Sequence, residues 1–204
     1  MQVFEIFSSF QGEGRRQGMR CCFLRLAGCN LGCRWCDTPD ARAAAAGKEL
    51  SSADILNRIE AMGTRYLCVT GGEPLLQMDE LAPLLRELSA RGYAIDIETN
   101  GTIPFCLVQP YASISMDVKC PSSGEQSDLT LLADIGSEDS VKYVVADNAD
   151  LEYAYEQIRS HPVPGAIFIS PVYGSDYAQI AETVMEWDLP VRLQLQLHKQ
   201  IGVK

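Results

Sequence analysis

The segment Cys29-Asn30-Leu31-Gly32-Cys33-Arg34-Trp35-Cys36 carries three cysteines on one short stretch, in the spacing C-x3-C-x2-C. Three thiolates this close in sequence can converge on one metal centre, and three ligands to a [4Fe–4S] cluster leave one iron open. A structural zinc knuckle needs four ligands, and the two histidines of the chain, His161 and His198, lie far downstream. Cys21 or Cys22 would have to supply the fourth. The spacing favours an iron–sulfur cluster, with zinc and a redox disulfide as the alternatives.

Short apolar runs alternate with helical patterns on both sides of this segment. The expected strands cover residues 22–26, 66–70, 94–98, 113–118, 141–145, 166–170 and 191–196. Each is mostly apolar, as expected for a strand that is covered on both faces. Helices are expected after the N-cap Ser51 and over residues 81–88, 149–160 and 175–187. This alternation implies right-handed βαβ crossovers and a parallel sheet.

The spacing of the strands limits the kind of parallel sheet. Residues 102–111 contain Pro104 and Pro110 and hardly accommodate a helix with its turns. We therefore expect an α/β fold in a single domain over residues 1–204, an abbreviated (partial) TIM-like parallel β/α barrel. The active site of such a barrel lies at the carboxyl ends of its strands. Polar residues follow the expected strands there, in the segments Thr70-Gly71-Gly72-Glu73, Glu98-Thr99-Asn100, Asp117-Val118-Lys119 and Ser170-Pro171.

The composition excludes several classes of protein. The chain has 17 Lys and Arg against 27 Asp and Glu, a net charge of -10, so it repels phosphate backbones and we expect no nucleic-acid partner. No apolar run approaches the ~20 residues of a membrane span, and the N-terminus shows no secretory signal. Eight cysteines are too sparse for a disulfide scaffold. A cytoplasmic enzyme with a small-molecule ligand is the expectation.

A second signal, Gly71-Gly72-Glu73-Pro74, follows the expected strand 66–70. Glycines at this place expose backbone groups to a polar ligand, and Glu73 can hold an ammonium group. Alone, the segment favours an ordinary βα turn. One strand–helix unit after the cysteine segment, it favours a ligand site.

The cysteine triad, with Trp35 before its last member, and the Gly-Gly-Glu segment resemble the radical S-adenosylmethionine enzymes. The resemblance implies a partial barrel of the radical SAM type and a [4Fe–4S] cluster whose open iron binds the amino and carboxylate groups of S-adenosylmethionine. An electron from the cluster then cleaves the sulfonium to give methionine and a 5′-deoxyadenosyl radical. That radical abstracts hydrogen from a substrate that is kept from water.

Further segments are similar to the 7-carboxy-7-deazaguanine synthase family. They are Phe7-Ser8-Ser9-Phe10-Gln11-Gly12-Glu13-Gly14, Phe23-Leu24-Arg25-Leu26-Ala27-Gly28, Asp37-Thr38, Glu98-Thr99-Asn100-Gly101-Thr102 and Gln196-Leu197-His198-Lys199. The resemblance implies a lyase that contracts the ring of 6-carboxy-5,6,7,8-tetrahydropterin to 7-carboxy-7-deazaguanine and releases ammonia, a step toward queuosine and other deazapurines. It also implies Mg²⁺, a homodimer and an electron donor of the flavodoxin or ferredoxin type.

The resemblance also assigns roles to single residues, together with the side-chain chemistry above. Cys29, Cys33 and Cys36 ligate the cluster, and Thr38 binds Mg²⁺. The residues expected to contact S-adenosylmethionine are Trp35, Asp37, Gly72, Glu73, Ser115, Met116, Asp117, Ser170 and Pro171. The residues expected to contact the pterin are Phe10, Gln11, Gly12, Arg25, Thr70, Glu98, His198 and Lys204, the last through its backbone carboxylate.

The C-terminal segment is expected to complete the substrate pocket. In a strand over 191–196, side chains alternate, so Gln194, Gln196 and the following His198 would share one polar side. A parallel final strand delivers the residues that follow it to the active-site face. We therefore expect residues 198–204 to fold over the mouth of the site.

Two other functions fit parts of the sequence. A glycyl-radical-enzyme activase shares the cysteine triad but acts on a protein. A non-enzymatic zinc-binding interaction module belongs to a different class. A brown colour after anaerobic preparation distinguishes iron–sulfur from colourless zinc.

Overall fold

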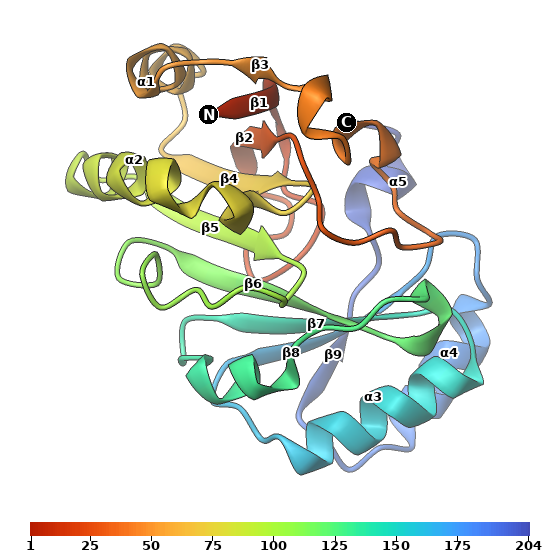
Figure 1. Cartoon of the computed structure of the whole chain (residues 1–204). Helices are drawn as coiled ribbons and strands as arrows, with labels where there is room; N and C mark the ends of the chain where they lie inside the picture. Colours follow the sequence, from red (N-terminus) through yellow and green to blue (C-terminus); the bar gives the residue numbers. More distant parts are fainter.

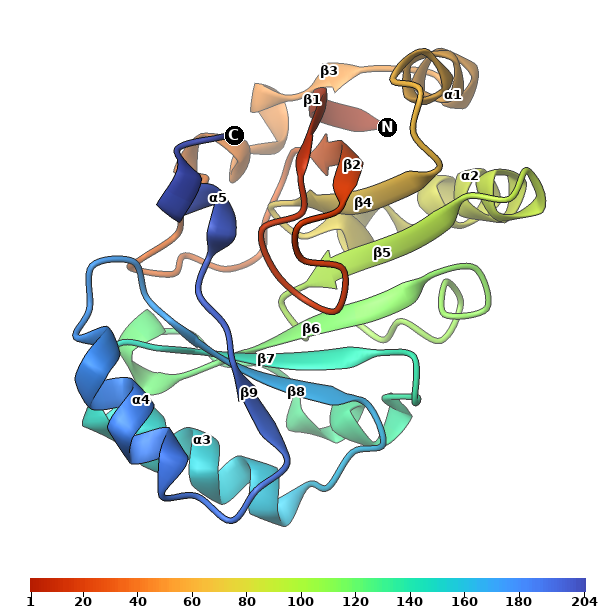
Figure 2. The ribbon, with the colours of Figure 1, turned by 180° about the vertical axis from the view of Figure 1, so that it is seen from behind.

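A computed structural model describes residues 1–204 and contains one nine-stranded sheet that curves into a partial barrel (Figures 1 and 2). The strands are β1 (Gln2–Phe10), β2 (Arg20–Leu26), β3 (Lys48–Glu49), β4 (Tyr66–Gly71), β5 (Ala94–Thr99), β6 (Ser113–Lys119), β7 (Ser140–Val145), β8 (Ala166–Pro171) and β9 (Val191–Leu193). Their order in the sheet is β3-β1-β2-β4-β5-β6-β7-β8-β9. Strands β2 and β4 to β9 pair in parallel, which confirms the abbreviated parallel barrel.

Helices lie in most of the connections between the parallel strands, and a last one follows β9. The α-helices are α1 (Ser52–Ala61), α2 (Met78–Ala90), α3 (Asn148–Ser160), α4 (Tyr177–Met185) and α5 (Leu197–Ile201). Short 3-10 helices are η1 (Pro39–Ala41), η2 (Ala44–Ala46), η3 (Pro74–Gln77), η4 (Pro121–Ser123) and η5 (Leu129–Asp134). The Ser51 side chain accepts a hydrogen bond from the backbone N–H of Asp54 and begins α1 as expected. Residues 102–111 form no helix, as their two prolines predict.

The two faces of the strands differ. One face is apolar and packs with α1 to α4 into the main core, through residues such as Leu24, Leu67, Ile97 and Val141. Because side chains alternate along a strand, the other face presents Arg25, Thr70, Glu98, Asp117 and Lys142 toward the inside of the barrel. The expectation that both faces of each strand are apolar is therefore wrong toward the carboxyl ends of the strands, where one face is polar.

Strands β1 and β3, which the sequence patterns do not predict, extend the parallel sheet with an antiparallel edge. At the other edge β9 ends at Leu193 instead of running to residue 196. The Gln194 backbone N–H still donates to Ile169 O of β8 (2.9 Å), while its side chain accepts a hydrogen bond from Gly14 N (2.6 Å) and donates one to Gly14 O (3.0 Å). The C-terminal segment, residues 194–204, thus bridges the open side of the barrel to the loop between β1 and β2 (Figure 2).

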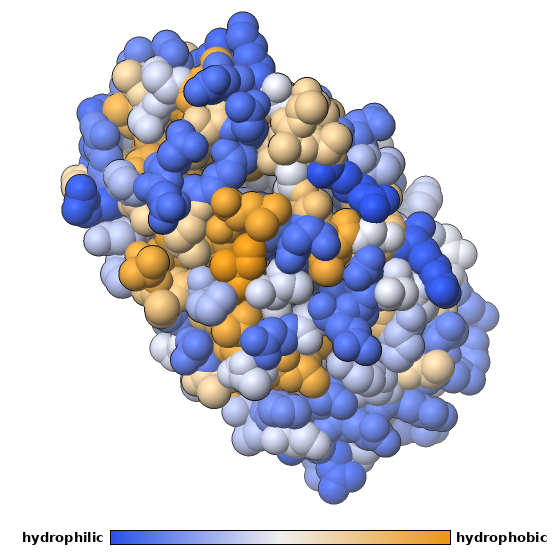
Figure 3. Space-filling model, in the orientation of Figure 1, coloured by the Kyte–Doolittle hydropathy of each residue, from blue (hydrophilic) through white to orange (hydrophobic).

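On the face seen in Figure 3, hydrophilic side chains cover most of the surface and an apolar band crosses its middle. No helix in the structure combines the length and the apolar character that crossing a membrane requires.

Candidate active site

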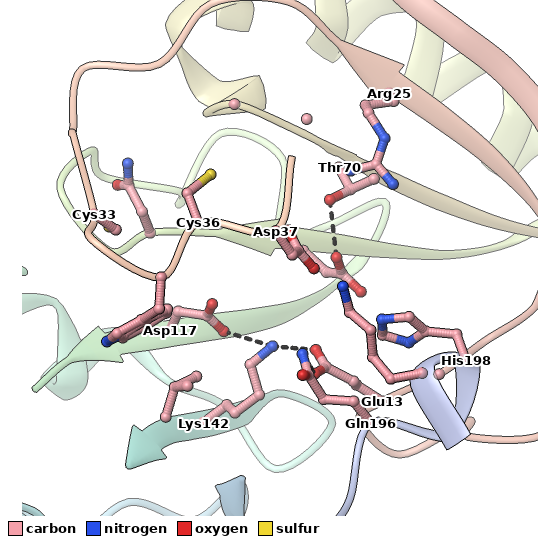
Figure 4. A pocket seen from close by; sticks show the side chains of 18 of the residues that line it. Glu13, Arg25, Cys33, Cys36, Asp37, Thr70, Asp117, Lys142, Gln196 and His198 are labelled. Atoms are coloured by element: carbon pink, nitrogen blue, oxygen red, sulfur yellow. Dashed lines mark hydrogen bonds and ion pairs between the residues drawn. The ribbon is translucent and has the colours of Figure 1, made fainter. Parts of the chain in front are cut away.

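A cavity of about 360 Å³ opens at the carboxyl ends of the parallel strands (Figure 4). This volume lies within the range of small-molecule sites. The cysteine loop (residues 29–36) forms one wall, and the C-terminal segment forms another. The expected site residues that line it are Phe10, Gln11, Gly12, Arg25, Cys29, Cys33, Trp35, Cys36, Asp37, Thr70, Gly72, Glu98, Asp117, His198 and Lys204.

The cysteine loop is held by hydrogen bonds that leave its thiols facing the cavity. Cys29 Sγ accepts hydrogen bonds from Leu31 N (3.4 Å) and from Asn100 Nδ2 (3.8 Å). The backbone N–H of Gly32 donates to Glu125 Oε1 at 2.6 Å, and Trp35 is anchored through its indole N–H. Burial raises the pKa of the Cys33 thiol, and the positive charge of Lys119 opposes that shift.

The donor chemistry of this loop fits a cluster better than a single ion. Cys21 and Cys22, the suggested fourth zinc ligands, are both fully buried within β2. Three half-buried free thiols on one loop, with N–H donors directed at sulfur, match the ligation of an iron–sulfur cluster.

The two glycines at the end of β4 allow the strands to approach closely. Gly71 has φ of 152°, and a Cβ there would lie 2.2 Å from Leu26 O. A Cβ on Gly72 would lie 2.1 Å from Gly28 O, immediately before the cysteine loop. Side chains at these positions would push the loop away from β4.

Glu73 lies behind this turn and does not line the cavity. Its fully buried carboxylate accepts hydrogen bonds from Asn100 N (2.6 Å), Thr99 Oγ1 (2.9 Å) and Leu75 N (3.0 Å). Burial raises its pKa to about 7. The carboxylate therefore fixes the end of β5, and with it the Asn100 side chain that donates to Cys29.

Opposite the cysteine loop lies an ionic cluster made of Glu13, Asp117, Lys119 and Lys142 (Figure 4). The β6–β7 register places Asp117 directly beside Lys142. The Lys142 ammonium donates to Glu13 Oε2 and lies 3.1 Å from Asp117 Oδ1, and Lys119 Nζ lies 3.1 Å from Asp117 Oδ2. Burial alone would raise the pKa of Asp117, but the charges of Lys119 and Lys142 outweigh it and lower the pKa.

Glu13 and Lys142 are not among the expected site residues, and Lys119 is expected only as part of the polar segment Asp117-Val118-Lys119. A lysine within the otherwise apolar run Val141–Val145 was the available signal, because a charge in a buried strand needs a partner.

Two buried side-chain atoms have no hydrogen-bond partner: Asp117 Oδ1 and Ser170 Oγ. They stand at the carboxyl-terminal ends of β6 and β8. Buried polar groups in proteins are almost always satisfied. The Ser170 hydroxyl, and Asp117 Oδ1 beyond its ion pair with Lys142 (3.1 Å), therefore suit hydrogen bonds to a ligand. The expected contacts that do not line the cavity are Thr38, Glu73, Ser115, Met116, Ser170 and Pro171. Of these, Met116 is buried in the helix-facing core.

The expected substrate residues form linked hydrogen bonds. Thr70 Oγ1 donates to Glu98 Oε2 (2.8 Å), and Gln11 Nε2 donates to Glu98 Oε1 (3.3 Å). Burial raises the pKa of Glu98, and the charge of Lys142 opposes the shift. Arg25, opposite Thr70 in the β2–β4 register, pairs with Glu5 (3.0 Å) and donates to Thr38 Oγ1 (3.3 Å).

The C-terminal segment lines the cavity, but not as a continued strand. Gln196 Nε2 donates to Glu13 Oε1 at 2.7 Å, and α5 begins immediately afterwards. The His198 ring lies against Gly12, where a Cβ would come within 1.9 Å of Nδ1. The Lys204 side chain pairs with Glu5, and the Lys204 backbone oxygen accepts a hydrogen bond from Ser9 Oγ at 2.6 Å.

Comparisons with known proteins agree with this geometry. Residues 24–118 match the family described as the Radical SAM superfamily. The chain is 51% identical over 203 residues to the 7-carboxy-7-deazaguanine synthase of Methanospirillum hungatei, covering 100% of this chain and 86% of that protein. It is 36% identical to the enzyme of the same name from Koribacter versatilis, covering 98% of this chain and 96% of that protein.

Solved structures show the same similarity. The crystal structure of QueE from Escherichia coli superposes with a TM-score of 0.77 and 26% identity, over 97% of this chain and 94% of that one. Streptococcus suis SuiB bound to the precursor peptide SuiA shares the fold alone, with a TM-score of 0.61 and 10% identity over 86% of this chain and 48% of that one.

Proposed function

The chain belongs to the 7-carboxy-7-deazaguanine synthase family of radical S-adenosylmethionine enzymes, and from this premise we propose that it is a carbon–nitrogen lyase with that activity. The proposed substrate is 6-carboxy-5,6,7,8-tetrahydropterin, whose ring contracts to give 7-carboxy-7-deazaguanine and ammonia. All atoms of the substrate are recovered in these two products, so the overall reaction needs no net oxidant or reductant.

The observation that carries the proposal is one cavity whose two walls bear different chemical groups. The cysteine loop and the ionic cluster flank one part of it, and Gln11, Arg25, Thr70 and Glu98 line another. A [4Fe–4S] cluster with S-adenosylmethionine supplies, when bound, a carbon radical that abstracts hydrogen. A radical of this kind requires a substrate held beside it and shielded from water.

The residues of the chain divide the binding between them. We assign the cluster to Cys29, Cys33 and Cys36, and the charged groups of S-adenosylmethionine to the surroundings of Asp117 and Gly72. The remaining cofactor contacts that we propose are Trp35, Asp37, Glu73, Ser115, Met116, Ser170 and Pro171. Of these, Glu73 and Met116 would act through the backbone, since their side chains are buried elsewhere.

Polar side chains on the substrate wall suit a pterin. Glu98 can accept hydrogen bonds from its amino and ring N–H groups, and the Arg25 guanidinium can pair with its carboxylate. Gln11, bonded to Glu98, supports that orientation. We also assign substrate contacts to Phe10, Gly12, Thr70, His198 and Lys204, which all line the cavity.

We assign a Mg²⁺ ion to Thr38, beside the carboxylate of the substrate. A hard cation takes oxygen ligands and keeps several waters, so one hydroxyl with substrate oxygens is a reasonable shell. The Thr38 hydroxyl lies 3.0 Å from Asp37 Oδ1 and accepts a hydrogen bond from Arg25. It is therefore held beside the residue that would pair with the substrate carboxylate.

The enzyme also needs a domain organisation, an oligomeric state, a location and an electron donor. From the family resemblance we propose a single radical SAM domain, a homodimer, a cytoplasmic location and an electron donor of the flavodoxin or ferredoxin type. The apolar band in Figure 3 is the kind of surface that a subunit interface uses. The net charge of -10 supports a small-molecule substrate over nucleic acid.

The test is anaerobic reconstitution with iron and sulfide, followed by incubation with S-adenosylmethionine, a reductant, Mg²⁺ and the carboxylated tetrahydropterin. The wild-type protein should form 5′-deoxyadenosine, 7-carboxy-7-deazaguanine and ammonia, measured by mass spectrometry and an ammonia assay. Glu98→Gln should retain iron and lose at least about tenfold in product formation, because a charged hydrogen-bond acceptor is lost. Formation of 5′-deoxyadenosine without any change in the pterin would contradict the proposed substrate.

A further inference from the structure

We propose that Lys142 couples the binding of S-adenosylmethionine to the closure of the C-terminal segment over the substrate side of the cavity. The inference rests on the proposed function, because it takes Asp117 as a contact of the cofactor. Lys142 is then a positioning residue, which acts through the two carboxylates beside it.

Lys142 lies in the middle of β7, between the buried Val141 and Tyr143. A charged side chain in such a strand destabilises the protein unless it is paired. Only 7% of the Lys142 side chain is exposed, and its ammonium is shared between Glu13 and Asp117. This one group therefore joins the loop that follows β1 to the end of β6.

Glu13 connects the same ammonium to the C-terminal segment. Its Oε2 faces Lys142, and its Oε1 accepts the hydrogen bond from Gln196 at 2.7 Å (Figure 4). Gln196 directly precedes α5, which carries His198 into the cavity. The position of the Glu13 carboxylate therefore determines how firmly α5 is held.

Asp117 supplies the connection to the cofactor. Lys119 pairs with its Oδ2, while Oδ1 is buried and makes no hydrogen bond, although the Lys142 ammonium lies 3.1 Å away. A ligand hydroxyl or ammonium that interacts with Asp117 weakens its attraction for Lys142. Lys142 then interacts more strongly with Glu13, and Gln196 is held more firmly. Two sites that share one group in this way change each other's affinity by the same factor.

Amide hydrogen exchange tests the coupling in the anaerobically reconstituted protein, with S-adenosylmethionine as the only probe and neither reductant nor pterin present. In the wild type, S-adenosylmethionine should slow the exchange of amides in Leu197–Ile201 by about fivefold or more. Lys142→Met keeps an unbranched side chain one atom shorter and removes its charge. It should still bind S-adenosylmethionine, with an affinity lowered by the same factor, and should lose the protection of α5. Lys142→Arg, which keeps the charge, should restore part of it.

Two variants outside the buried cluster make the test independent of the stability of Lys142→Met. Gln196→Ala breaks the last connection and should lose the protection, while Gln200→Ala, exposed on the same helix, should keep it. Wild-type protection in Lys142→Met or Gln196→Ala would overturn the coupling, and so would a wild-type protein whose α5 does not respond. Failure of the wild type to convert the pterin is measured separately and bears on the proposed function alone.

Discussion

The cysteine loop and the ionic cluster line the same cavity, yet they are assembled in different ways (Figure 4). The loop takes its three thiols from eight consecutive residues. The ionic cluster takes its charges from the loop after β1 and from β6 and β7, and its Lys142–Glu13 pair spans 129 residues of the chain. The first arrangement is set by sequence spacing, while the second exists only after the strands have found their register.

The difference shows which contacts hold the side chains of each group in position. Leu31 and Asn100 donate hydrogen bonds to Cys29 Sγ, and the Trp35 indole donates one to Ser122 Oγ. These bonds orient the cysteine loop, so its thiols face the cavity even though the loop has no regular structure. The ionic cluster is fixed by the β6–β7 pairing, which sets Asp117 beside Lys142. Variants in the loop should therefore change what is bound, and variants in the cluster should change how the bound groups are aligned.

Removing one thiol of the cysteine loop should have the largest effect on activity. Alanine at Cys29, Cys33 or Cys36 should abolish cluster binding and, with it, all cleavage of S-adenosylmethionine, because two thiolates cannot hold the cluster. Iron content and 5′-deoxyadenosine formation measure both effects.

Alanine at Cys106, the exposed cysteine, is the matched control and should leave the iron content unchanged. The four remaining cysteines are buried, and burial raises the pKa of Cys22 to about 11 and those of Cys21, Cys68 and Cys120 as well. These thiols stay protonated near neutral pH, whereas metal ligation needs thiolates. Loss of iron in a Cys120→Ala variant would show that the triad is not the whole ligand set.

The same division explains what the sequence could predict. Six of the seven expected parallel strands, the cap at Ser51 and the triad follow from local patterns, and the structure has those strands within one or two residues. The antiparallel β1 was missed because Glu5, Ser8 and Ser9 obscure its apolar alternation. The strand expected over 191–196 ends early, and the Gln194 side chain there bonds to a glycine 180 residues away, a contact that no local pattern encodes.

Glu73 combines both kinds of positioning. It is adjacent to the glycine turn in sequence, but it supports the cysteine loop through Asn100 at the end of β5. Its folded-state pKa of about 7 exceeds the ordinary 4.5, so between these values the folded protein keeps a proton that the unfolded chain has released. The contribution is fully present below pH 4.5 and is lost as the pH rises to 7, a change of roughly 3 kcal/mol at 1.36 kcal/mol per pH unit.

Urea unfolding at a series of pH values measures this dependence. Glu73→Gln has no carboxyl group there, so the difference in unfolding free energy between wild type and variant should follow that slope and become constant above pH 7. Arg91→Ala, which removes exposed pairs with Glu60 and Glu87, is the control and should leave the slope unchanged. Parallel pH profiles for wild type and Glu73→Gln would assign the slope to other groups.

Shortening the C-terminal segment tests whether this segment helps to align the substrate. Deleting residues 201–204 removes the contacts of Lys204 with Ser9 and Glu5 but keeps the Gln196–Glu13 hydrogen bond. The KM for the pterin should rise about tenfold, as expected for lost charged hydrogen bonds, while S-adenosylmethionine cleavage without substrate persists. Steady-state kinetics with and without pterin separate the two effects. An unchanged KM would mean that the four residues are only surface.

Replacing Thr38 should have the smallest effect on turnover. Thr38 follows the cysteine loop in sequence, and its hydroxyl accepts a hydrogen bond from Arg25. Thr38→Ala should retain iron and S-adenosylmethionine cleavage and lose several-fold of the stimulation of turnover by Mg²⁺, since one protein oxygen leaves a shell that water and substrate otherwise fill. A titration of product formation against Mg²⁺ concentration measures the loss. Thr38→Ser, which keeps the hydroxyl, should behave like the wild type. If Thr38→Ala responds to Mg²⁺ as the wild type does, the ion binds elsewhere and Thr38 serves only to hold Arg25, in which case the substrate KM, and not the metal dependence, should change.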